Sequence, residues 1–167
     1  MTKNIENDEY LSIVNDILDN QEFNKLDTIS HHGISRLEHS IRVSYFSYKI
    51  TKFLRLNYEV TARAGLLHDF FISDENRNMK DRFLSTFTHP KYAVMNASEY
   101  FEIDDLGKNI IESHMFPIYK SLPKYAESWI VSFVDKVSAI YEFSRTASLK
   151  CSYMTNLFIL MILNNLR

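Results

Sequence analysis

The sequence predicts an all-α protein, and three observations carry that prediction. Only three Gly and three Pro occur among 167 residues, which is few for the many turns of a β-sandwich or β-barrel. Apolar residues recur at spacings of three and four, the periodicity of one face of a helix. No segment has the pattern of a convincing strand. We therefore expect a compact, single-domain helical bundle over residues 1–167.

Composition narrows the class of protein further. Apolar residues make up 46% of the chain, enough for a sizeable core, so disorder is disfavoured. The net charge is −2 without a basic stripe, which disfavours nucleic-acid binding. The single cysteine, Cys151, cannot form an internal disulfide and suits a reducing cytosol. The N-terminus has no signal-peptide core, and the longest apolar run (157–163) is far too short to span a membrane. We therefore expect a soluble, cytoplasmic protein.

The first half of the chain predicts two helices separated by a loop. One face of the first helix is marked by Ile13, Val14, Ile17 and Leu18. The stretch 27–33 is expected as a loop. Ser35 stands three residues before Glu38, a capping-box pattern that places a helix start near Arg36. An apolar stripe continues this second helix, and we expect it to end at Asn57.

The second half predicts further helices with recognisable starts. A shorter helix over 58–69 contains residues small enough for a neighbouring helix to approach closely: Ala62, Ala64 and Gly65. Pro is favoured at the first helical position, so Thr88-His89-Pro90 predicts a helix start, with the helix continuing to about Tyr100. Asp104 and Asp105 open the next helix, where they are favourably placed against its macrodipole. A long helix follows Pro123, and a separate final helix is expected over about 152–166.

Histidine and aspartate residues recur along these helices. In order they are His39, His68, Asp69, His89, His114 and Asp135. Imidazole nitrogen and carboxylate oxygen are the ligands that hold Zn, Mn, Fe, Co or Ni in hydrolytic sites. The spacing fits about one ligand from each helix, with several helices converging on one point. The adjacent residues His68 and Asp69 can serve one centre if several helices surround them or if the helix ends there. The polar run 73–80 favours an ending. The series predicts metal-assisted hydrolysis.

The motifs around these residues are similar to those of a known family. They are Arg36-Leu37-Glu38-His39, Ala64-Gly65-Leu66-Leu67-His68-Asp69, His89, His114 and Val134-Asp135-Lys136. From about residue 36 to 142 the chain therefore resembles the HD superfamily of metal-dependent phosphohydrolases. The resemblance implies that one metal is bound by His39, His68, Asp69 and Asp135. It also implies that His89 and His114 are the two additional histidines of members with two metals.

The same resemblance limits what can be said of the substrate. The ligand set is similar to that of HD-type hydrolases of diadenosine tetraphosphate. However, Phe70-Phe71 follows the His-Asp pair, where many members have Ile-Gly and a lysine. The motifs of cyclic-dinucleotide phosphodiesterases are also absent. The resemblance thus implies the family and the type of reaction, and not which compound is hydrolysed.

Charge explains why such a ligand set suits phosphate chemistry. Four neutral imidazoles and two carboxylates around two divalent ions leave a net charge of about +2, which attracts a phosphate anion. Asp69 has two oxygens and is the natural bridge between ions about 3.5–4 Å apart. Metal binding lowers the pKa of water toward about 7, and the resulting hydroxide is expected to attack phosphorus in line. We expect one or two ions of Fe, Mn, Zn, Co or Ni.

Two cations adjoin the ligands. Arg36, one helical turn before His39, is a candidate to bind a substrate phosphate; the alternative is a solvated arginine. Lys136 is a candidate to neutralise phosphate or to pair with an acid. The role of the loop residues His31 and His32, at a substrate entrance or simply on the surface, is left open. The alternatives to metal binding are a helix-dipole partner for His114 and a helix cap for His89.

Three functions compete. The leading interpretation is a phosphohydrolase acting on a small phosphorylated metabolite, in the first place a nucleotide. The second is a non-catalytic sensor that binds a nucleotide or a metal in the same pocket. The third is a diiron HD-fold oxygenase, which needs a larger ligand set and substrate domain than the sequence offers. The Met- and Phe-rich C-terminal tail is either core or a homodimer interface.

Overall fold

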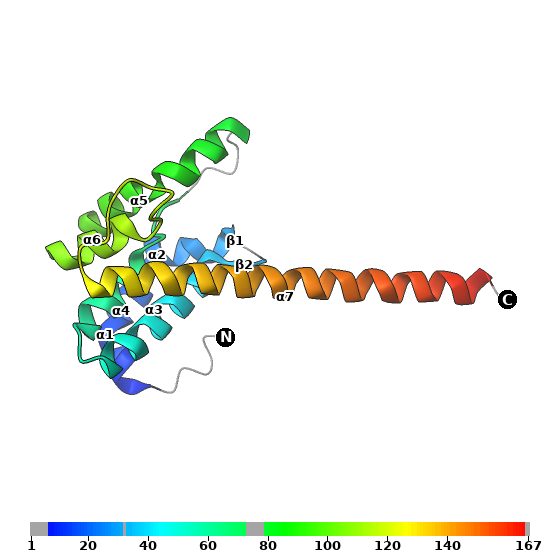
Figure 1. Ribbon diagram of the computed structural model, residues 1–167, viewed down its shortest axis with the longest axis horizontal. Coiled ribbons are helices and arrows are strands. Elements are labelled where there is room, and N and C mark those ends of the chain that lie inside the picture. Colours follow the sequence, from blue (N-terminus) through cyan, green and yellow to red (C-terminus); the bar gives the residue numbers. More distant parts are fainter. Residues whose placement is uncertain (1–6, 32, 73–78, 166–167) are drawn as a thin grey trace.

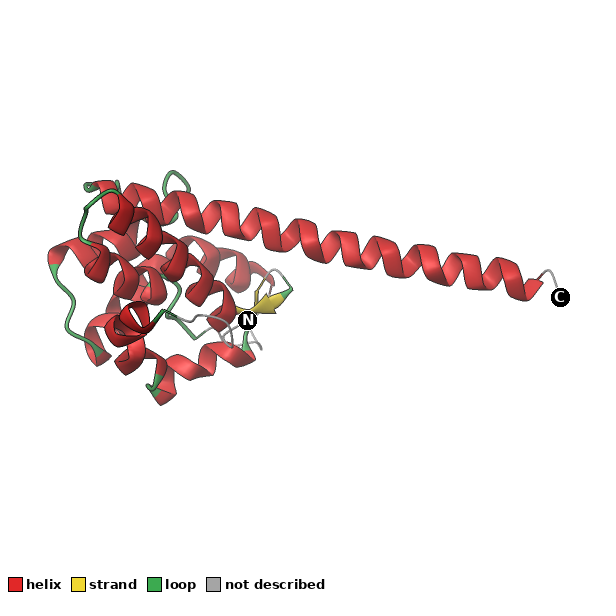
Figure 2. Cartoon of the chain, turned by 90° about the horizontal axis from the view of Figure 1, so that it is seen from below, coloured by secondary structure: helices red, strands yellow, loops and turns green. Residues whose placement is uncertain are grey.

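The computed structural model describes residues 7–31, 33–72 and 79–165, which are almost entirely helical (Figure 1; Figure 2). In order the elements are α1 (Asp8–Leu18), α2 (Gln21–Asn24), the 3-10 helix η2 (Lys25–Thr28), β1 (Ser30–His31), β2 (Ile34–Ser35), α3 (Arg36–Phe53), α4 (Tyr58–Leu67), α5 (Met79–Tyr100), α6 (Asp105–Ser113) and α7 (Ala126–Asn165). The predicted all-α class is confirmed. No helix among the described residues combines the length and apolarity needed to cross a membrane.

α3 is the central helix of the bundle and packs against α4 and α7. Where α3 meets α4, a Cβ atom on Gly65 would lie 3.2 Å from the Cα atom of Ser44. The Ser44 hydroxyl donates a 2.6 Å hydrogen bond to the carbonyl of Ala62 and accepts one of 2.9 Å from the hydroxyl of Tyr10 in α1. The close helix approach predicted from the small residues of α4 is therefore confirmed.

Two predicted helix starts are confirmed by their caps. The Ser35 hydroxyl accepts a 3.1 Å hydrogen bond from the backbone N–H of Glu38 at the start of α3. The carboxylate of Asp104 accepts one of 2.7 Å from the backbone N–H of Gly107 at the start of α6. Each side chain satisfies an N–H group that has no partner within its helix.

The predicted end of α3 at Asn57 is wrong. The helix ends at Phe53, and Arg55 adopts a left-handed backbone with φ of 58°. The Asn57 side chain instead accepts a 3.2 Å hydrogen bond from the backbone N–H of Val60 and caps the start of α4. Asn is favourable both after a helix and before one, so its identity alone did not distinguish the two positions.

The helix start predicted at Thr88-His89-Pro90 is also wrong. α5 begins at Met79, and Pro90 lies in its interior. An interior proline lacks an N–H and crowds the carbonyl four residues earlier, which makes it uncommon there and explains the error. His89 is therefore held in the middle of a helix rather than at its first turn.

Two further expectations are corrected. The separate helix expected over 152–166 continues α7, because neither Gly nor Pro interrupts the chain after Pro123. The expected loop over 27–33 contains the end of η2 and also β1, which pairs with β2 in an antiparallel two-residue ladder. Gly33, with φ of 93°, makes the turn between them. His32 lies outside the described residues, so the expectation for its role stays a prediction.

Candidate metal centre

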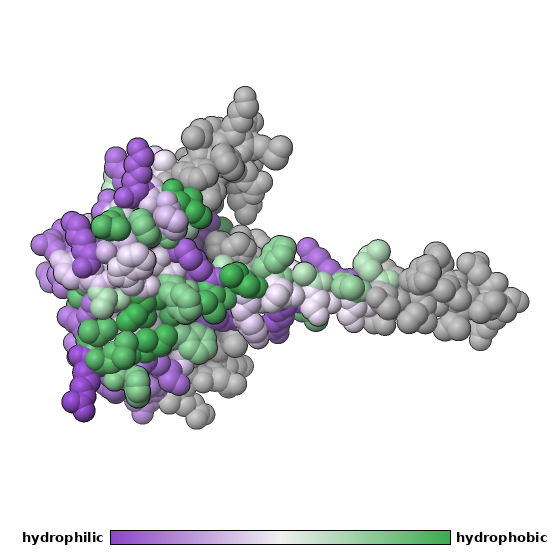
Figure 3. Space-filling view, in the orientation of Figure 1, coloured by the Kyte–Doolittle hydropathy of each residue, from purple (hydrophilic) through white to green (hydrophobic). Residues whose placement is uncertain are grey.

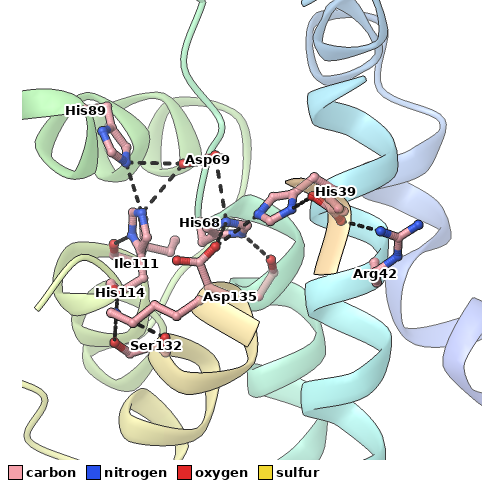
Figure 4. Close-up of polar contacts among 12 residues, drawn as sticks. His39, Arg42, His68, Asp69, His89, Ile111, His114, Ser132 and Asp135 are labelled. Carbon is pink, nitrogen blue, oxygen red and sulfur yellow. Dashed lines mark hydrogen bonds and ion pairs between the residues drawn. The ribbon is translucent and has the colours of Figure 1, made fainter. Parts of the chain in front are cut away.

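The structure brings the whole predicted His/Asp series into one buried cluster (Figure 4). Its members come from five helices or helix ends: His39 from α3, His68 and Asp69 after α4, His89 from α5, His114 after α6 and Asp135 from α7. α4 ends at Leu67, and His68 caps it with backbone angles that are still helical (φ −56°, ψ −33°), so the chain leaves the helix at His68 and Asp69. Their proximity is what the spacing predicted, and metal binding by them remains a prediction.

One half of the cluster forms around Asp135. Its Oδ1 atom lies 3.0 Å from Nε2 of His39 and 3.7 Å from Nε2 of His68. One ligand atom from each of these residues falls within 4.8 Å of the others, a grouping that can hold a metal ion. This half contains three of the residues that the resemblance implies for a single metal.

The other half of the cluster forms around Asp69. Its Oδ1 atom lies 3.3 Å from Nε2 of His89 and 3.6 Å from Nε2 of His114, and the two Nε2 atoms are 3.0 Å apart. Its second oxygen, Oδ2, lies 3.8 Å from Nε2 of His68. The two oxygens of Asp69 therefore face the two halves of the cluster, as expected of a bridging carboxylate.

These atoms suit a divalent cation in both spacing and chemistry. Ligands about 2.1 Å from an ion are separated from each other by about 3.0–3.4 Å in octahedral or tetrahedral geometry, close to the separations above. Within the described part of the chain, the Nε2 atom of His68 is buried and has no hydrogen-bond partner. Buried polar atoms rarely stay unpaired in folded proteins. A metal ion would give this nitrogen a partner.

Backbone carbonyl groups orient two of the imidazole rings through hydrogen bonds. The Nδ1 atom of His68 donates a 2.8 Å hydrogen bond to the carbonyl of Gly65, and that of His114 donates one of 2.7 Å to the carbonyl of Ile111. Each histidine follows its helix directly, so an unpaired carbonyl of the last turn lies within reach. Because Nδ1 carries the proton, Nε2 is the nitrogen that each ring presents to the centre.

A carboxylate outside the predicted series holds the third imidazole. Nδ1 of His39 lies 2.9 Å from Oε2 of the buried Glu142, and the other oxygen of Glu142 accepts from the guanidinium of Arg42. A carboxylate on the far nitrogen fixes the tautomer and orientation of a metal-binding histidine. Sequence reasoning missed Glu142, although it follows Asp135 by two helical turns and thus shares its face of α7.

The carboxylates of the cluster are held in their ionised form. Burial opposes ionisation of Asp69, but the imidazoles of His68 and His89 outweigh it and hold its pKa well below the usual range. Burial likewise opposes ionisation of Asp135, and the contacts with His39 and His68 lower its pKa. Negative charge is therefore concentrated where a cation would sit.

The histidines divide into two kinds. Burial, reinforced by the neighbouring His68, lowers the pKa of His114 to about 3, so this ring is neutral at pH 7, the form that binds metals. Burial also disfavours charge on His39, but its contacts with Asp135 and Glu142 prevail and raise its pKa to about 10. A metal ion would have to displace a proton from His39, so metal affinity is expected to increase with pH.

The two candidate cations bind the backbone beside the ligands. Arg36 is buried and is not the solvated side chain of the alternative interpretation; its Nη1 donates a 2.7 Å hydrogen bond to the carbonyl of Phe71. Its guanidinium lies over the Phe71 ring, which stacks on His89 with 4.9 Å between ring centroids. Lys136 donates a 2.9 Å hydrogen bond to the carbonyl of His114. Arg36 thus holds Phe71 against His89, and Lys136 holds the backbone of His114.

Glu142→Gln is expected to weaken metal binding by about 10–100-fold, the usual cost of losing a hydrogen-bond partner of a metal-binding histidine. The amide keeps the size of the side chain but loses the charge that orients His39. Competition with a chromophoric chelator would measure the affinity. Glu38→Gln is the matched control, because Glu38 also pairs with Arg42, at 3.5 Å. Equal losses in the two variants would assign the effect to Arg42 instead of His39.

Comparison with protein families matched the HD domain over residues 36–140. That span contains all six residues of the His/Asp series and about two thirds of the chain. Neither the curated proteins nor the solved structures gave a match.

Proposed function

Since this chain belongs to the HD domain family, we propose that it is a metal-dependent phosphohydrolase. The proposed substrate is a small phosphorylated metabolite, in the first place a nucleotide, in which a phosphoester or phosphoanhydride bond is cleaved. The observation that supports this best is the placement of Asp69, whose oxygens face two separate groups of imidazoles at 3.3–3.8 Å. Bridging carboxylates of this kind serve two-metal phosphate hydrolysis.

The proposed ligand assignment follows the two halves of the cluster. His39, His68 and Asp135, with one oxygen of Asp69, would hold one ion. His89 and His114, with the other oxygen of Asp69, would hold the second. A mixed imidazole and carboxylate donor set suits divalent Fe, Mn, Zn, Co or Ni. When bound, such a pair of ions supplies Lewis acids for phosphoryl oxygens and lowers the pKa of water.

The chain itself would contribute charge and orientation to the reaction. Asp69 and Asp135 offset part of the cationic charge and leave about +2, which favours binding of a phosphate anion. Glu142 keeps the His39 ring turned toward the cluster. We further propose that Arg36, whose positive charge acts on Asp69, and Lys136 support a phosphate next to the ligands. Because both are bound to the backbone, their effect would combine charge with positioning.

A panel of nucleotides and other phosphorylated metabolites tests the proposal. Purified protein supplied with Mn, Fe, Co, Ni, Zn or Mg should release phosphate or a nucleoside phosphate from at least one compound. A chelator should abolish the activity, and one of these metals should restore it. Nucleotide binding without turnover under every metal would favour the sensor, and metal-dependent O₂ consumption would favour the oxygenase. Either result would overturn the proposal.

A further inference from the structure

The C-terminal half of α7 extends away from the rest of the molecule (Figure 1). Near the middle of the helix, Thr146 still lies against Gly33. Beyond it, Leu149, Tyr153 and Met154 are all more than 60% exposed. A helix that packs against nothing gains little stability in water, because most helical stability in proteins comes from packing of an apolar face. An extended helix with exposed apolar residues therefore suggests a packing partner.

An exposed, mostly apolar stripe on α7 follows a heptad pattern. One series of positions seven apart comprises Phe133, Ile140, Ala147 and Met154, and it continues in the sequence at Met161. The companion series comprises Val137, Ser144 and Cys151, and it continues in the sequence at Phe158. Alternate spacings of three and four over several heptads are the signature of helices that pair with one another. The stripe continues from the body of the molecule into the extended half, with the small residues Ser144 and Ala147 at the crossing.

The body carries a groove on the same stripe. Where α7 meets α3, a cavity of about 410 Å³ is lined mainly by Phe46, Ile50, Phe133, Val137 and Tyr141. These side chains are 38–67% exposed, and apolar residues gather on this face of the molecule (Figure 3). One molecule thus offers both an apolar groove and an apolar helix, which are the two halves of a self-complementary interface.

We propose that two copies of this chain form an antiparallel dimer in which the extended half of each α7 lies in the α3–α7 groove of the other copy. Antiparallel heptads pair the two series with each other, so Met154 of one copy would lie against Val137 of the second. Cys151 would lie against Ile140, and Ala147 against Ser144. The small residues then meet at the two-fold axis, where the helices cross most closely. The larger ones fill the grooves at either end.

The apolar area available is sufficient for such a dimer. In addition to Met154, the stripe and groove expose Phe46, Ile50, Phe133, Val137, Ile140 and Tyr141, at 38–70% each. At on the order of 100 Å² per side chain, two copies would bury about 1,400 Å². Specific interfaces bury about 1,200–2,000 Å² in total. The dimer does not depend on metal binding or on the proposed reaction.

The mass in solution provides the first test. Light scattering or sedimentation should give twice the 19.7 kDa of the chain, and Met154→Glu or Ile140→Glu should give the monomer with its helical content retained. Leu149→Glu is the matched control, because Leu149 is equally exposed but lies about 200° around the helix from Ala147. A monomeric wild type would overturn the proposal. This holds also if the monomer binds lipid vesicles, because its apolar stripe would then contact lipid and not a second copy. So would a dimer that withstands both glutamates or is broken equally by Leu149→Glu.

Cross-linking tests the direction of the pair. In a Cys151→Ser background, a mixture of Val137→Cys and Met154→Cys proteins should give the mixed cross-linked dimer, because these positions face each other only in the antiparallel arrangement. A parallel pair would instead cross-link each variant to itself. It would also join wild-type chains through Cys151. Predominant cross-links between identical positions would overturn the antiparallel arrangement.

Discussion

Asp69→Asn is expected to reduce phosphate hydrolysis by about 10²–10³-fold, the scale on which loss of a group that stabilises transition-state charge affects turnover. The amide keeps the size of the side chain but offers one oxygen and no negative charge. In the structure both carboxylate oxygens lie near imidazole nitrogens. One faces His89 and His114, and the other faces His68. Steady-state kinetics on the best substrate of the panel, with metal content measured alongside, would give the effect.

The fold should survive this substitution, which circular dichroism and thermal unfolding can verify. Asp19→Asn is a suitable control, since Asp19 is an exposed residue at the end of α1. It should leave both metal content and turnover unchanged. A folded Asp69→Asn protein with near-normal turnover would contradict the bridging role and reduce Asp69 to a structural residue of the cluster.

His114→Ala is expected to remove one of two metal ions and most of the activity. His114 and His89 face the same oxygen of Asp69, whereas His39 and His68 lie against Asp135 on the opposite side. Loss of His114 should therefore empty one position and leave the other. Elemental analysis should change from about two ions per chain to about one.

His89→Ala should reproduce this stoichiometry, and it provides a second variant if the cavity left by His114 destabilises the protein. His39→Ala should act on the other ion and leave the position beside His89 and His114 occupied. If the His114 and His89 variants both retained the metal content of the wild type, the centre would hold a single ion. His114 would then keep its alternative role at the helix end, whereas the helix cap proposed as the alternative for His89 is excluded by its place inside α5.

The His/Asp cluster was predictable because its signals are local and repeated. His68-Asp69 at the end of a helix, with one histidine or aspartate on each neighbouring helix, requires only that the helices converge. The helix starts at Ser35 and Asp104 were predictable for a similar reason, since a capping side chain and its helix are adjacent in sequence. The caps therefore depend little on tertiary context, and the cluster depends only on the convergence of the helices.

Other features depended on tertiary contacts that a single sequence does not display. Pro90 carries the signal of a helix start, but packing of α5 places it in the helix interior. Glu142 resembles any acidic residue on a helix until the fold brings it 2.9 Å from His39 across the bundle. Likewise, Arg36 was expected to bind a phosphate or solvent, and its bond to Phe71 depends on how the chain turns after Asp69.

The metal content of the purified protein tests the central claim most directly. Protein prepared without chelators should contain about two divalent transition-metal ions per chain by elemental analysis, drawn from Fe, Mn, Zn, Co and Ni. Protein stripped of metal should regain the same number on addition of one of these ions, and its unfolding temperature should rise because the ions bind only the folded cluster. A folded protein that contains none of these metals, and takes up none when they are supplied, would contradict the account.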